Sequence, residues 1–119
     1  MTGLCVVLAA GLTLIAPGDR FQLVWTHSVE KVEWREDWRI ADGRLILELA
    51  SVVGSGAGME PPPQAVFRED RYVWNPGITQ AELVLARSDF TRDWRLCADG
   101  ICRALPPAET GITRLAACR

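Results

Sequence analysis

The fold of this chain is decided by residues 33–49, EWREDWRIADGRLILEL. Side chains of a β-strand alternate between its two faces, so Trp34, Trp38 and Ile40 share one face while charged side chains line the other. Glu36 lies on the apolar face as well. Alternation of this kind is typical of a half-buried antiparallel strand.

Asp42-Gly43 is the strongest short-range signal of a β-hairpin, because both residues of a type I′ turn have positive φ. A two-residue turn gives the cross-strand pairs Ala41–Arg44, Ile40–Leu45, Trp38–Leu47 and Glu36–Leu49. The apolar faces of the two strands then coincide, which a slip of one residue would prevent. The inward positions of the second strand are predicted to be Leu45, Leu47, Leu49 and Val53.

The same register places Asp37 opposite Glu48 on the outer face. Like charges in a cross-strand pair are unfavourable. We therefore expect Arg39 or Arg35 to reach over to this pair.

Residues 21–28 form a second alternating segment. Its inward positions are Phe21, Leu23, Trp25 and His27. Two polar groups, His27 and Glu36, thus lie on apolar faces, and a carboxylate beside tryptophans is costly unless it is paired, hydrogen-bonded or protonated. Either the two groups meet in a site, with Glu30 or Glu60, or they lie at the rim of the fold and are satisfied by backbone or water.

Residues 54–63, GSGAGMEPPP, cannot form a regular element. The alternating glycines allow positive φ, and the prolines lack amide donors. This segment is either a backbone nest for an anion or ligand headgroup, ending at Glu60, or a surface loop. It is neither a phosphate-binding loop nor a dinucleotide fingerprint, because no Lys-Ser/Thr pair and no helical pattern follow. The candidate ligand-binding set comprises His27, Ser28, Glu30, Glu36, Gly54, Ser55, Gly56, Gly58, Met59 and Glu60.

No catalytic constellation accompanies these residues. Ser28 follows His27 on one strand, so the two side chains point to opposite faces and His27 cannot easily activate the hydroxyl. One histidine with carboxylates could instead hold a divalent ion through mixed nitrogen and oxygen ligands. We expect a protein that is not an enzyme and has no cofactor.

Length and charge exclude several classes of protein. A chain of 119 residues, 49% hydrophobic and 24% charged, makes one globular domain. Its net charge of −2 argues against nucleic-acid binding, which needs a basic footprint.

A second hairpin is predicted in residues 94–102, WRLCADGIC. An Asp99-Gly100 turn pairs Ala98 with Ile101 and Cys97 with Cys102. The cysteines then form a non-hydrogen-bonded pair with Cα atoms about 4.5 Å apart, which permits a disulfide. Free thiols and a metal site are the alternatives, although Cys5, Cys118 and His27 are not obviously gathered for zinc.

The first 17 residues are apolar enough to resemble a signal peptide, but no Lys or Arg precedes Arg20. They are also too few to span a membrane as a helix, which needs about 20 apolar residues. We prefer a hairpin with strands at 4–9 and 12–16 and a turn at Ala10-Gly11, because β-branched residues lie on both sides of the glycine. The hairpin implies a cytoplasmic protein, and an atypical signal segment implies a periplasmic or membrane-associated one.

The remaining chain predicts further short strands at 71–74, 82–88 and in the cysteine hairpin of 94–105. Residues 64–70 are ambiguous, and residues 106–119 form a weakly patterned tail that is expected to fray. In total we expect about eight short strands and no helix. The predicted fold is a single all-β domain, an antiparallel meander closing as a small β-barrel or sandwich.

Four parts of the sequence resemble one bacterial family. They are residues 25–31 (WTHSVEK), Trp34 with Glu36 and Trp38, residues 54–62 (GSGAGMEPP), and residues 93–97 (DWRLC) with Gly100 and Cys102. The family is the domain of unknown function numbered eighteen-fifty, and the resemblance covers roughly Leu4 to Leu105.

This resemblance implies no established activity and no catalytic residues. Members tend to be encoded beside TAXI-type TRAP transporters, which take up small organic anions with an extracytoplasmic binding protein. Some members carry an N-terminal membrane helix, and no convincing one is seen here, so membrane contact is left open. The expected function is a non-enzymatic accessory module for such a transporter. The alternative is a β-barrel that binds a small anionic ligand or a metal at His27, Glu36 and the glycine loop of 54–60.

Overall fold

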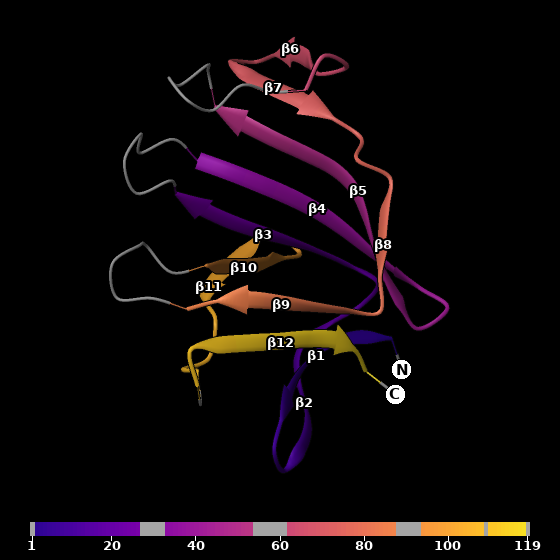
Figure 1. The fold of residues 1–119 in the computed structure, drawn as a ribbon, viewed down its shortest axis with the longest axis vertical. Coiled ribbons are helices and arrows are strands. Elements are labelled where there is room, and N and C mark those ends of the chain that lie inside the picture. Colours follow the sequence, from indigo (N-terminus) through magenta and orange to yellow (C-terminus); the bar gives the residue numbers. More distant parts are fainter. Residues whose placement is uncertain (1, 27–32, 54–61, 88–93, 109, 119) are drawn as a thin grey trace.

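A computed structural model of the protein describes residues 2–26, 33–53, 62–87, 94–108 and 110–118 (Figure 1). These residues form strands and connecting turns only. The strands are β1 (Gly3–Leu8), β2 (Gly11–Pro17), β3 (Arg20–Thr26), β4 (Glu33–Ala41), β5 (Arg44–Val53), β6 (Val66–Arg68), β7 (Arg71–Trp74), β8 (Ile78–Gln80), β9 (Glu82–Ala86), β10 (Arg95–Ala98), β11 (Ile101–Ala104) and β12 (Ile112–Ala117). The all-β prediction is confirmed. The described residues contain twelve strands rather than the eight or so that we expected, and β6, β8 and β12 were not predicted.

The strands form two antiparallel sheets that make a sandwich-like fold, so the closed-barrel alternative is wrong. The smaller sheet has the order β2-β1-β12-β9, and the larger has the order β11-β10-β3-β4-β5-β7-β6, with β8 also paired to β5. The core combines inward side chains of both sheets, among them Leu4 and Leu115 from the smaller sheet and Leu23 and Leu45 from the larger. These four leucines are fully buried.

The central hairpin β4–β5 follows the predicted register only as far as the Trp38–Leu47 pair. A bulge then leaves Glu48 without a cross-strand partner, so Leu49 lies opposite Asp37 and Ala50 lies opposite Glu36. The predicted Glu36–Leu49 and Asp37–Glu48 pairs are therefore wrong. A bulge adds one residue to one strand and reverses the faces beyond it.

The bulge changes which residues of β5 face the core. Ala50 and Val52 point inward, while Leu49 is 43% exposed and Val53 pairs with Arg71 on the outer face. The predicted inward positions of Leu49 and Val53 are therefore wrong.

Glu48 lies on the outer face and accepts hydrogen bonds from Arg39 Nε and Arg20 Nη1, both at 2.9 Å. Of the two arginines predicted to reach over to the Asp37–Glu48 pair, Arg39 does pair with Glu48, although Asp37 is not opposite it. The hydrogen bond from Arg39 contributes most to lowering the pKa of the Glu48 carboxyl.

The N-terminal residues form the predicted hairpin, with β1 and β2 joined by a turn at Ala9-Ala10, one residue earlier than expected. β1 is an interior strand, paired with β2 on one side and β12 on the other. No helix in the described residues has the length and apolar character needed to span a membrane.

Residues 112–117 correct the prediction of a frayed tail. They form β12, which lies between β1 and β9 in the smaller sheet. The inward positions of β12 are Thr113, Leu115 and Ala117. Because only one of the three is a large apolar residue, the strand shows little alternation in hydropathy and its sequence pattern is weak.

All four cysteines form disulfides. Cys97–Cys102 closes the β10–β11 hairpin with a Cα–Cα distance of 4.0 Å, as the turn at Asp99-Gly100 predicted. Cys5–Cys118 joins β1 to the end of β12 across a sequence separation of 113 and was not predicted. The free-thiol and metal alternatives for the cysteines are therefore wrong.

Candidate functional site

Four tryptophans form a continuous row on the inward face of the larger sheet. Trp25 and Trp34 are a cross-strand pair of β3 and β4 with stacked rings, 5.7 Å between centroids. Trp94, just before β10, is tilted against Trp25 with 5.5 Å between ring centroids, and Trp74 of β7 makes a T-shaped contact with Trp34 with 5.9 Å between centroids. All four side chains are half-buried. The Trp25–Trp34 pair of this row lies at the end of the larger sheet where β3 ends and β4 begins (Figure 1).

Glu36 lies beside this row, between Trp34 and Trp38 on the inward face of β4. Its cross-strand neighbours are Leu23 and Ala50, so apolar groups surround it in the sheet. The indole Nε1 of the buried Trp38 donates a hydrogen bond to Glu36 Oε1 at 3.0 Å. Burial raises the pKa of the Glu36 carboxyl above its usual value, and the hydrogen bond from Trp38 opposes this effect. The carboxyl thus retains its proton to a higher pH than an exposed glutamate would.

The indole nitrogen of Trp34 supplies a second polar feature. Trp34 Nε1 is buried and finds no hydrogen-bond acceptor within the described part of the chain. A buried donor without an acceptor costs free energy, so it favours a bound group that can accept. Trp34 therefore combines ring contacts within the row with an indole donor that has no acceptor among the described residues.

Of the predicted ligand-binding set, only Glu36 lies among the described residues. The others, which are His27, Ser28, Glu30, Gly54, Ser55, Gly56, Gly58, Met59 and Glu60, lie in segments 27–32 and 54–61, outside them. These segments follow Thr26 and Val53, the last residues of β3 and β5. Whether His27 meets Glu36 therefore stays a prediction.

A metal centre finds no support in the described ranges, where no three His, Cys, Asp or Glu side chains are grouped to hold an ion.

Sequence reasoning missed Trp74 and Trp94 as members of the row. Both fall at the ends of predicted strands, but they are 20 residues apart and come from strands that are not neighbours of each other in the larger sheet. Only the order β10-β3-β4-β5-β7 brings them to opposite ends of the Trp25–Trp34 pair.

A family profile for the domain of unknown function DUF1850 matches residues 21–105. The chain belongs to this family. It is the family whose motifs the sequence resembles, and the matched range contains the tryptophan row and Glu36. No curated protein and no solved structure shows significant similarity to the chain.

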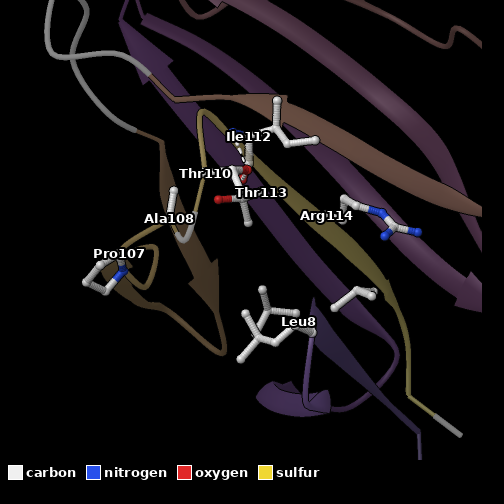
Figure 2. A pocket seen from close by; sticks show the side chains of 10 residues that line it. Leu8, Pro107, Ala108, Thr110, Ile112, Thr113 and Arg114 are labelled. Carbon is white, nitrogen blue, oxygen red and sulfur yellow. Dashed lines mark hydrogen bonds between the residues drawn. The ribbon is translucent and has the colours of Figure 1, made fainter.

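A pocket in this DUF1850 protein lies elsewhere, with a volume of about 560 Å³. It opens between the end of β1 and the segment before β12, and both of these lie outside residues 21–105. Figure 2 shows Leu8 on one side and Pro107 and Ala108 on the other, with the Arg114 side chain directed away. Arg114 forms a two-pronged ion pair with Glu82, at 2.6 and 2.9 Å.

The remaining polar side chains of this pocket also have partners. Thr113 Oγ1 accepts a hydrogen bond from Arg87 Nη1 at 2.6 Å, and Thr110 Oγ1 accepts one from the backbone N–H of Ile112. The pocket thus offers mainly apolar walls. None of its described lining residues has an unpartnered buried polar atom comparable to Trp34 Nε1, so the tryptophan row is the stronger candidate site.

We predict that Glu36→Gln gains stability relative to wild type as pH rises. The folded-state pKa of Glu36 lies above the ordinary value of 4.5, so the native protein binds more protons than the unfolded chain between these two values. Glu36 therefore lowers the free energy of unfolding of the wild-type protein as pH rises through this window, and it has no such effect at pH values below the window. Glutamine keeps an oxygen that can accept the Trp38 hydrogen bond. Urea unfolding of both proteins from about pH 4 to about pH 8 measures the difference, and a difference independent of pH would contradict the prediction.

Proposed function

We propose that this DUF1850 domain is a non-enzymatic interaction module that binds a partner through the tryptophan row. The observation that carries the proposal is the alignment of four half-buried tryptophans on one sheet face, next to the core. Tryptophan is enriched among the residues that dominate binding energy at interfaces. Contiguous aromatic surface on a folded domain commonly marks an interaction site.

The class of partner comes from the family resemblance. Members tend to be encoded beside TAXI-type TRAP transporters, so the partner that we propose is a permease or binding protein of such a transporter. The domain would then act as an accessory component. Its sandwich presents the row on strands of a sheet, and a rigid framework of this kind suits docking because little order must be gained on binding.

Trp74→Ala is expected to weaken partner binding by at least about thirtyfold, the effect of losing a strong interface residue. Trp74 is suited to the test because it lies at the end of the row, where its ring makes a T-shaped contact with Trp34. Ile101→Ala is the matched control, since Ile101 is 62% exposed on β11 of the same sheet.

The measurement is affinity capture from native membranes, with bound proteins quantified by mass spectrometry. Recovery of a permease or binding protein with wild type and Ile101→Ala, and its loss with folded Trp74→Ala, supports the proposal. Capture of no transporter component by wild type would refute the transporter as partner, and equal capture by Trp74→Ala would refute the row as the binding face.

A second candidate is a small-ligand site at His27, Glu36 and the glycine loop. The observation that favours it is the buried Trp34 Nε1, which has no acceptor among the described residues and lies on the same face of β4 as Glu36, whose carboxyl has a raised pKa. A carboxylic acid could accept from the indole and share the Glu36 proton. Isothermal titration with small carboxylates and divalent ions tests this function, and absence of heat for every probe would exclude it.

A further inference from the structure

On the outer face of the larger sheet, opposite the tryptophan row, one carboxylate lies among three guanidinium groups. Glu33 begins β4 and Arg35 follows it on the same face, while Arg71 comes from β7 and Arg95 from β10. Arg71 Nη1 lies 3.1 Å from Glu33 Oε1 and Arg35 Nη2 lies 3.6 Å from the same oxygen. Arg95 Nη2 lies 3.6 Å from Glu33 Oε2. We call these four residues the arginine cluster.

Glu33 satisfies this cluster incompletely. Only Arg71 lies within hydrogen-bond distance of the carboxylate, since a separation of 3.6 Å is too long for a hydrogen bond. Arg71 also donates from Nε to Ser51 Oγ at 3.1 Å. Arg71 Nη2 and Arg35 Nε are nevertheless buried without an acceptor among the residues that the structure describes.

The charges are unbalanced as well. Among the described residues, the ion pairs of Glu33 set three guanidinium groups against one carboxylate. Arg71 is the most enclosed of the cluster, with a side chain 18% exposed. Desolvated positive charge with unused donors attracts an anion, and the planar fork of arginine matches the oxygen spacing of carboxylate, phosphate and sulfate groups.

We propose that the arginine cluster binds a small oxyanion, and that Glu33 competes with the anion for the same donors. This proposal does not rest on the proposed function, because the cluster and the tryptophan row lie on opposite faces of the sheet. The Glu33 carboxylate marks the place that the oxyanion of the ligand takes, and displacing it frees the Arg71 donor at 3.1 Å.

The first test follows the arginine Nε–H resonances of ¹⁵N-labelled protein during titration with sodium sulfate. Sodium chloride at matched ionic strength is the control for general screening. The proposal expects saturable shifts with sulfate for Arg35 and Arg71 and no saturable shifts with chloride. Small, non-saturating shifts that are equal for the two salts would overturn it.

Variants then separate a binding site from a structural network of ion pairs. Arg71→Gln is expected to abolish saturable binding, and Arg95→Gln, whose native side chain is 53% exposed and less important to packing, is expected to weaken it. Arg103→Gln on β11 of the same sheet is the control and should bind sulfate as wild type does.

The direction in which Glu33→Gln changes sulfate affinity tests whether Glu33 competes with the anion. If Glu33 competes with the anion, its removal tightens sulfate binding by about fivefold, the effect of losing one partly exposed charge contact. Weaker binding by a folded Glu33→Gln protein would show that the carboxylate holds the arginines in place and would overturn the competition.

Discussion

Replacing Cys5 and Cys118 together by alanine is expected to lower the free energy of unfolding by about 4 to 5 kcal/mol, because their disulfide closes a loop of more than a hundred residues. The bond spans a sequence separation of 113, so its loss returns much conformational freedom to the unfolded chain. Alanine is preferred to serine because Cys5 is 4% exposed and a buried hydroxyl would add a cost of its own. Denaturant unfolding without reductant measures the change.

The double replacement of Cys97 and Cys102 is the matched control. These cysteines are separated by 5 residues, and the same loop-closure estimate gives about 2 kcal/mol. A comparable loss for both pairs would contradict the loop-length argument. A negligible loss for Cys5 and Cys118 would show that the bond is not formed in the protein.

The same experiment bears on where the domain works. Wild type in thiol reductant should approach the stability of the variants. Disulfides persist in oxidising compartments and are rare in the cytosol, so a strong dependence on the Cys5–Cys118 bond would favour an extracytoplasmic location. In that case the N-terminal hairpin would be present, as the structure shows, but the cytoplasmic location that we expected from it would be wrong.

The two disulfides show how far the sequence could be interpreted. Cys97 and Cys102 flank an Asp-Gly turn, so local geometry alone predicts their pairing. Cys5 and Cys118 become neighbours only because β1 pairs with β12. That pairing could not be foreseen, since residues 112–117 show too little alternation to predict a strand.

The candidate site could also be predicted only in part, because the order of strands in the larger sheet could not be foreseen. Alternation placed Trp25, Trp34 and Glu36 on apolar faces, but the pairing of β3 with β4 that makes Trp25 and Trp34 cross-strand neighbours was not predicted. Trp74 and Trp94 join them through pairings between strands distant in sequence. The arginine cluster has the same origin, because its members come from β4, β7 and β10.

Leu47→Ala is expected to lower the free energy of unfolding by about 2 to 4 kcal/mol, the usual cost of truncating a core leucine. Leu49→Ala should cost no more than about 0.5 kcal/mol, as exposed substitutions do. Both residues lie on β5, two positions apart, but Leu47 is 6% exposed and Leu49 is 43% exposed. Urea unfolding at one pH compares the two variants directly.

This pair tests the bulge at Glu48, the feature that unbroken alternation cannot predict. Without the bulge, Leu47 and Leu49 would both face the core and the two variants would lose similar stability. The sequence holds a hint, because unbroken alternation would also turn Ser51 inward and Val52 outward, whereas the bulge buries Val52 in the core and lets Ser51 accept from Arg71. Equal losses for the two variants would mean that β5 continues in the simple register, and Glu36 would then lie opposite Leu49 rather than Ala50.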